Sequence, residues 1–256
     1  MSKNFELLQR AEISLGATPG FADDVSVRRE ESVTPATAGA AEVISTLVPE
    51  VREEALKLVQ RLFLIPQQPS PKAVVFAGVD ANTACNWLCS ITAKLLAKSV
   101  PGSVCLAEGD FRQPSIRAFL GMDHDRGFVD ALRTDGPIGE FAKPLGPDNL
   151  WLLPAGVPAR DSAVLLNSDR MKERITELRK RFDYLILNAS PLGLFGDAMV
   201  LGRMVDGVVL VLEANSTRRE VALRVTESLK AMNIPVLGAV LNNRTFPIPA
   251  AVYKRL

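Results

Sequence analysis

From Ala73 onward, short apolar runs alternate with longer runs that have helical periodicity. The strand-like runs are almost continuously apolar, which is typical of parallel strands covered on both faces. They are residues 73–78, 103–109, 150–156, 184–190, 207–214 and 235–242. The helix-like runs between them are residues 84–99, 114–120, 127–133, 161–181, 195–204 and 217–232. This alternation predicts an α/β domain with a doubly wound, mostly parallel sheet.

The segment before Ala73 predicts a helical extension. Residues 2–15 carry a partial apolar stripe and predict a short helix, and residues 16–40 are rich in Gly, Pro, Thr and charge, as a flexible linker would be. A second helix is predicted over residues 40–64, with Pro49 as the point where it could break. We therefore divide the chain into an N-terminal helix and linker, 1–40, and an α/β domain, 41–256.

Bulk composition excludes several classes of function. The chain has 30 basic and 29 acidic residues, so it has no net field for nucleic acid. No apolar run approaches the roughly 18 residues that span a bilayer. Three scattered cysteines do not form a disulfide framework, which favours a reducing cytoplasm. His124 is the single histidine, so no multi-histidine metal site is expected.

The loop after the first strand has the outline of a phosphate-binding loop without its side chains. Such a loop reads strand, GxxxxGK[ST], helix. Counting from Gly78 places Thr83 at the second glycine, Ala84 at the lysine and Cys85 at the Mg²⁺-binding hydroxyl. Backbone N–H groups at a helix start can bind anions whatever the side chains are. A degenerate nucleotide loop and an ordinary turn both remain open. The candidate loop residues are Gly78, Asp80, Asn82, Thr83, Ala84, Cys85 and Asn86.

Polar residues also follow three later strands. Glu108 and Asp110 could hold Mg²⁺ or accept a hydroxyl proton, or could form a charged turn. Asn188 ends an apolar strand where a metal-binding acid could stand, although a neutral amide is a poor ligand for a hard cation. Asn242 could bond a purine edge or lie in a turn.

In combination, these segments resemble the bacterial tyrosine kinases of capsule and exopolysaccharide synthesis, which are P-loop proteins related to MinD and ParA. The resemblance covers about residues 50–245. The best-matching segments are VCLAEGDFRQPSI, LWLLPAG, LLNSDRMKERITELRKRFDYLIL and DAMVLGRMVDGVVLVLEA.

The resemblance implies site residues, several of which have changed. The family's phosphate-binding lysine falls on Ala84 and its Walker B aspartate on Asn188, while its Walker A′ acids fall on Glu108 and Asp110. The acid after Walker B falls on Asp197.

Two further features of the family are reduced. Its oligomerisation motif ExxRxxR falls on Glu54, Lys57 and Gln60, and its tyrosine-rich tail is reduced to Tyr253, the expected phosphoacceptor.

The resemblance therefore predicts a catalytically impaired pseudokinase. We expect a cytoplasmic protein, peripheral at the inner membrane through a partner, with no cofactor. Expected partners are a membrane polysaccharide co-polymerase (chain-length regulator), an active kinase paralogue or a second copy of the chain. Two alternatives stay open. One is an active ATP- and Mg²⁺-dependent autokinase that uses Glu108 and Asp110, and the other is a MinD/ParA-like ATPase acting as a positioning switch.

Overall fold

The structure is a computed structural model that describes residues 49–65, 70–81, 83–122 and 126–243. The predicted N-terminal helix and linker, Asn82, His124 and Tyr253 lie outside these ranges. Among the described residues, no helix is both long and apolar enough to cross a membrane.

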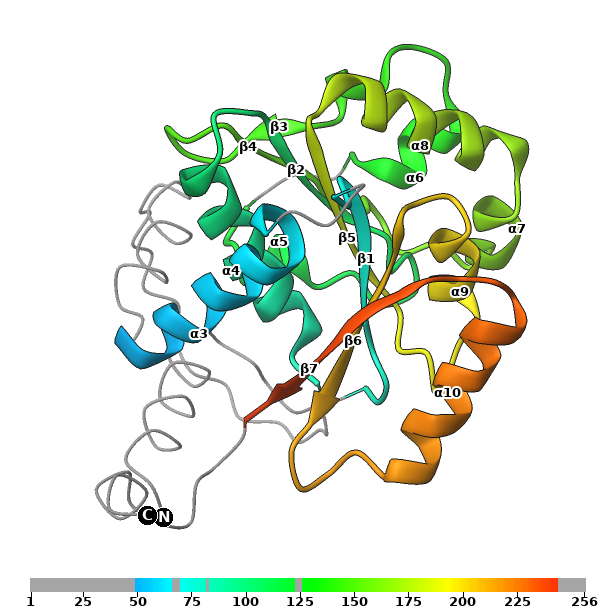
Figure 1. Cartoon of the computed structure of the whole chain (residues 1–256). Coiled ribbons are helices and arrows are strands. Elements are labelled where there is room, and N and C mark those ends of the chain that lie inside the picture. Colours follow the sequence, from blue (N-terminus) through cyan, green and yellow to red (C-terminus); the bar gives the residue numbers. More distant parts are fainter. Residues whose placement is uncertain (1–48, 66–69, 82, 123–125, 244–256) are drawn as a thin grey trace, which may run out of the picture.

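Strands and helices alternate along the described chain as the sequence predicts (Figure 1). The strands are β1 (Ala73–Gly78), β2 (Val104–Glu108), β3 (Lys143–Pro144), β4 (Leu150–Leu153), β5 (Tyr184–Ala189), β6 (Gly207–Glu213) and β7 (Val236–Asn242). The α-helices are α3 (Pro49–Val59), α4 (Cys85–Ser99), α5 (Ile116–Phe119), α6 (Phe128–Arg133), α7 (Ser162–Leu166), α8 (Asp169–Arg181), α9 (Asp197–Gly202) and α10 (Arg219–Ala231). A π-helical turn, η1 (Gln60–Leu64), continues α3, and a 3₁₀ turn, η2 (Ile138–Glu140), precedes β3.

The strands form one seven-stranded sheet in the order β3-β4-β2-β5-β1-β6-β7. Every neighbouring pair is parallel except β3 with β4. The chain leaves β1 through α4 and returns to the sheet at β2, beyond β5, whereas β6 and β7 lie on the other side of β1. The predicted doubly wound, mostly parallel sheet is confirmed.

Side chains alternate between two cores along each central strand, because successive residues of a strand point to opposite faces. In β1, Val74 and Phe76 pack beneath α3 and α4, while Ala73, Val75 and Ala77 face the opposite layer. Helices α6 to α10 cover that second face (Figure 1). All six residues of β1 are buried, which explains why the strand lacks polar alternation.

The structure differs from the predicted elements in three places. The run 161–181 is two helices, because Ser168 begins α8 as an N-cap whose side chain accepts a hydrogen bond from the Met171 N–H. The antiparallel β3 has only two residues, too few to give a periodic signal. The helix predicted to reach residue 64 changes to π-helical geometry after Val59.

Candidate functional site

The polar residues predicted after separate strands meet at the carboxyl ends of β2 and β5. Glu108 and Asn188 are register partners, and Asn188 also lies beside Phe76 of β1. Asn188 Nδ2 donates to Glu108 Oε1 at 2.8 Å. Binding sites of open parallel sheets lie at this edge, so the fold brings the predicted cluster to the expected place.

Glu108 is fully engaged by its neighbours. Its Oε2 accepts hydrogen bonds from the backbone N–H groups of Ser115 and Ile116, at 3.1 and 2.8 Å. Burial raises the pKa of the Glu108 carboxyl to about 7, against the opposing effect of bonds from Ile116, Asn188 and Ser115. The negative charge of Asp110 raises this pKa further. Glu108 therefore ties the end of β2 to the start of α5.

A second group of contacts joins the segment after β2 to the start of α9. Asp110 Oδ1 accepts from the Ser190 hydroxyl at 2.8 Å and from two backbone N–H groups, those of Arg112 and Gln113. Ser190 Oγ also lies 3.3 Å from Asp197 Oδ2. The Arg112 guanidinium donates to both oxygens of Asp197, at 2.7 and 3.2 Å, and stacks over the Phe195 ring. The acids here are thus bonded within the protein.

The loop between β1 and α4 is held by its own polar groups. The Thr83 side chain is buried, its hydroxyl donates to the Asp80 carbonyl at 3.2 Å, and its carbonyl accepts from Asn242 Nδ2 at 3.2 Å. Asp80 Oδ2 is buried without a hydrogen-bond partner among the described residues. Asn242, at the end of β7, thus reaches the loop backbone.

Two cysteines occupy the first turns of α4. Cys85 is half-buried and Cys89 is buried, with their Sγ atoms 4.0 Å apart. Cys89 Sγ also lies 3.6 Å from Asn188 Oδ1. Burial, and then the neighbouring Cys85, raises the pKa of the Cys89 thiol far above its ordinary value. Cys89 is therefore a neutral thiol packed against the candidate site.

These residues do not fit ATP with Mg²⁺. A P-loop site needs a lysine on the β- and γ-phosphates and a hydroxyl on the metal. Ala84 and Cys85 provide neither, and Asn188 provides an amide in place of the Walker B acid. The described residues also contain no group of three or more His, Cys, Asp or Glu side chains arranged to hold a metal. The side chains at these three positions thus differ from those of a P-loop that binds ATP with Mg²⁺.

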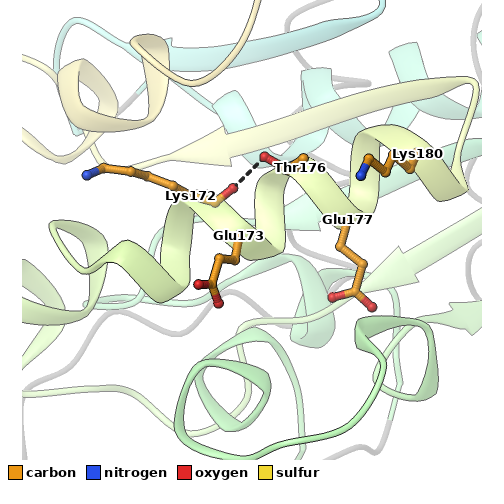
Figure 2. Close-up of a pocket in the computed structure, with 5 residues that line it drawn as sticks. All are labelled: Lys172, Glu173, Thr176, Glu177 and Lys180. Atoms are coloured by element: carbon orange, nitrogen blue, oxygen red, sulfur yellow. Dashed lines mark hydrogen bonds between the residues drawn. The ribbon is translucent and has the colours of Figure 1, made fainter.

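A surface hollow lies away from this edge of the sheet. It has a volume of about 440 Å³ and is lined by one face of α8 (Figure 2). The lining residues are Lys172, Glu173, Thr176, Glu177 and Lys180. Its lining comes from a single exposed helix face with charges of both signs, and no polar groups from other described elements converge on it. The hollow is therefore not a competing candidate.

The predicted oligomerisation residues lie on α3 and η1. Glu54 and Gln60 are exposed, and Lys57 pairs with Glu53 and Glu54 of the same helix at 3.1 and 2.9 Å. The apolar side of the segment, which includes Val59, packs into the core shared with α4. Within the described residues, the polar side of α3 is exposed, and Leu64 at the end of η1 is exposed as well.

Sequence similarity points to one group of proteins. The chain is 28% identical over 141 residues to tyrosine-protein kinase YwqD of Bacillus subtilis, which is 55% of this chain and 60% of YwqD. The chain is a homologue of bacterial tyrosine-protein kinases. It spans less than two thirds of YwqD, and no family model matches it.

Solved structures agree on the fold. The kinase domain of Escherichia coli tyrosine kinase ETK matches with a TM-score of 0.72 and 17% identity, covering 87% of this chain and 86% of that domain. The septum site-determining protein MinD of Pyrococcus horikoshii, solved with Mg-ADP, matches with a TM-score of 0.56 and 20% identity, covering 72% and 76%. This chain thus has the MinD/ParA-like P-loop fold.

Sequence reasoning left out two connecting residues. Ser190 bridges Asp110 and Asp197, and Cys89 lies beside Asn188. The position of Ser190 directly after a buried strand was the available signal. No sequence signal marked Cys89 as a site residue, because a cysteine inside an apolar helix is usually a core residue.

Proposed function

We propose that this chain is a non-catalytic relative of the bacterial tyrosine kinases that acts in capsule or exopolysaccharide biosynthesis by binding other proteins. One observation carries the proposal: at the strand ends, Arg112 pairs with Asp197, and Asn188 pairs with Glu108. In this arrangement the acids that would serve a metal are already bonded to protein groups.

The size of the chemical loss supports the proposal. Phosphoryl transfer depends almost entirely on positioning and on charge stabilisation by cations. Removing a single preorganised stabiliser typically costs on the order of 10²–10³ in rate. This chain lacks the lysine, the metal-binding hydroxyl and the Walker B acid together, and Asp80 adds a negative charge to the loop. The combined loss removes the main sources of catalysis, although such losses need not add.

The proposed partner is either a membrane-embedded chain-length regulator or an active kinase of the same family. The exposed polar side of α3 and η1, with Glu54 on α3 and Gln60 on η1, is the surface proposed for this contact. The protein would then work in the cytoplasm and reach the inner membrane through its partner. The chain would contribute a binding surface, and where the partner is an active kinase, that kinase would supply nucleotide turnover.

Calorimetric titration with ATP and Mg²⁺ tests the proposal. We expect no heat of binding at micromolar protein, and no phosphotyrosine by mass spectrometry after incubation of the purified chain with ATP. Sub-micromolar affinity, or stoichiometric label on Tyr253 without another kinase, would establish the autokinase alternative instead. Titration of the variant Asn188→Asp distinguishes loss of the Walker B acid alone from loss of the whole site.

A further inference from the structure

One residue of the loop between β1 and α4 adopts a backbone conformation that normally requires glycine. Ala84 has φ 47° and ψ 39°, in the left-handed region, and α4 begins at the next residue. Among the described loop residues Ala84 alone has this geometry, and Gly78 does not. Left-handed geometry is unfavourable for an ordinary L-residue, because its Cβ comes too close to the following carbonyl oxygen. Ala84 therefore stands where a glycine would be favoured.

The left-handed residue lets the loop be aligned with the P-loop motif by counting from the start of α4. In a P-loop, the second glycine directly precedes the lysine and the hydroxyl residue that open the helix. We propose that Ala84 takes the place of that glycine, Cys85 that of the lysine and Asn86 that of the metal-binding hydroxyl. Each position lies one residue further along than counting from Gly78 gives. The inference rests on the proposed function, because it treats the loop as a degenerate P-loop.

Thr83 has the properties of a packed structural residue and none of those of a glycine position. Its side chain is buried and bonds the Asp80 carbonyl, and its own carbonyl holds Asn242. The packing also explains Gly78, because a Cβ on Gly78 would collide with the Thr83 hydroxyl. Gly78 is thus needed to make room for Thr83. Its being a glycine is therefore no reason to equate it with the first glycine of the P-loop motif.

The new assignment changes which side chains would face a phosphate. Cys85 is the first residue of α4 and is half-buried, next to Cys89. Asn86 uses its Oδ1 to accept the backbone N–H of Trp87 at 2.8 Å. Neither side chain provides a positive charge. The loop therefore retains the helix start of a P-loop but replaces its cation with a thiol.

Two repaired proteins distinguish the alignments. The helix-counted variant carries Ala84→Gly, Cys85→Lys, Asn86→Thr and Asn188→Asp. The strand-counted variant carries Thr83→Gly, Ala84→Lys, Cys85→Thr and Asn188→Asp. Both are made in the full chain, checked for folding by circular dichroism and titrated with ATP and Mg²⁺ by calorimetry.

The helix-counted variant should bind ATP·Mg²⁺ at least tenfold more tightly than the strand-counted variant. The single change Ala84→Gly should also raise the melting temperature by about 2–4 °C, and Thr83→Gly should lower it. A folded helix-counted variant that binds no more tightly than the strand-counted one, or an Ala84→Gly protein that is not stabilised, would overturn the assignment. Nucleotide binding by the unmodified chain would instead contradict the proposed function, so the two failures are distinguishable.

Discussion

Arg112 and Asp197 form a two-bond ion pair that joins the segment after β2 to the start of α9. The Asp197 side chain is only 7% exposed and that of Arg112 is 31% exposed, so water screens the pair incompletely. Its geometry is the bidentate arrangement that arginine forms with carboxylates. The pair neutralises an acid that the fold would otherwise leave buried at the sheet edge.

Removing the charge of Asp197 should destabilise the fold measurably. We expect Asp197→Asn to lower the free energy of unfolding by about 1–3 kcal/mol, because the charged pair is lost. The cost is limited because the partly exposed Arg112 can be hydrated. Urea denaturation measures the change. The matched control is Asp161→Asn, which breaks an exposed pair with Arg133 and should cost less than about 1 kcal/mol. Equal effects of the two variants would show that the site pair behaves as an ordinary surface pair.

Glu108 predicts a pH dependence of stability. Its pKa rises from an ordinary 4.5 to about 7 in the folded protein, so the folded state holds this proton more tightly than the unfolded state does. The contribution of Glu108 to stability is therefore full below about pH 4.5, falls as the pH rises toward 7, and is lost above that. The loss should be on the order of 3 kcal/mol.

The neutral variant Glu108→Gln tests this pH dependence. Denaturation between pH 5 and 8 should give a flatter stability profile for Glu108→Gln than for the unmodified protein, because the variant cannot ionise at this position. The exposed Glu227 offers the control Glu227→Gln, which should retain the original slope. A slope unchanged by Glu108→Gln would place the titrating group elsewhere.

The buried Arg174 should be the most sensitive position on α8. Its guanidinium donates to the carbonyls of Ala131, Thr134 and Gly136, and to Glu177. Replacement by methionine keeps the aliphatic volume but leaves these acceptors without their donor. We expect Arg174→Met to cost about 3–5 kcal/mol of unfolding free energy.

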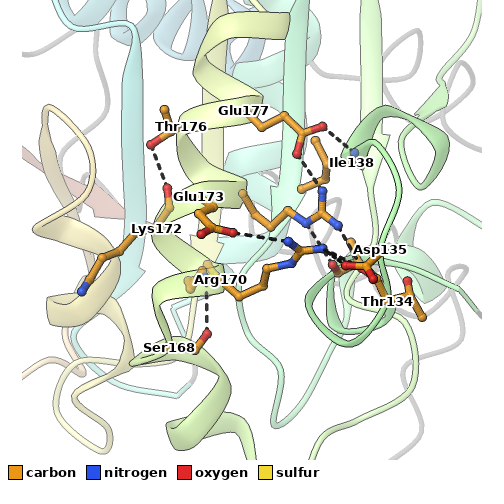
Figure 3. Close-up of polar contacts among 12 residues, drawn as sticks. Thr134, Asp135, Ile138, Ser168, Arg170, Lys172, Glu173, Thr176 and Glu177 are labelled. Carbon is orange, nitrogen blue, oxygen red and sulfur yellow. Dashed lines mark hydrogen bonds and ion pairs between the residues drawn. The ribbon is translucent and has the colours of Figure 1, made fainter.

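A neighbouring arginine provides the control for that measurement. Arg170 donates to the Thr134 carbonyl, Asp135 and Glu173 (Figure 3). It is far more exposed than Arg174, with 34% of its side chain accessible against 5%. Arg170→Met should cost about 1 kcal/mol or less, because water can replace its contacts. Similar costs for the two variants would contradict the role given to burial.

The sequence predicted the fold well because parallel strands covered on both faces give unmistakable apolar runs. It also identified most of the polar cluster, since residues at the carboxyl ends of neighbouring parallel strands must meet. It could not predict how Glu108 or Arg112 would be bonded, because those contacts join residues up to 85 positions apart. The left-handed conformation of Ala84 was equally hidden, because alanine rarely adopts it and the letters of the loop give no sign of it.

The exposed side of α3 should control any association of the chain. Because the apolar side of α3 is used within the core, contact with another molecule through this segment would depend on polar groups such as Glu54 of α3 and Gln60 of η1. Exposed ion pairs contribute only about 0–1 kcal/mol, so we expect weak, concentration-dependent oligomers. Light scattering across a concentration series should detect them, and Glu54→Arg should weaken them by reversing a charge. The matched change Glu227→Arg, on the exposed side of α10, should leave association unchanged. A tight assembly that is insensitive to Glu54→Arg would show that another surface forms the interface.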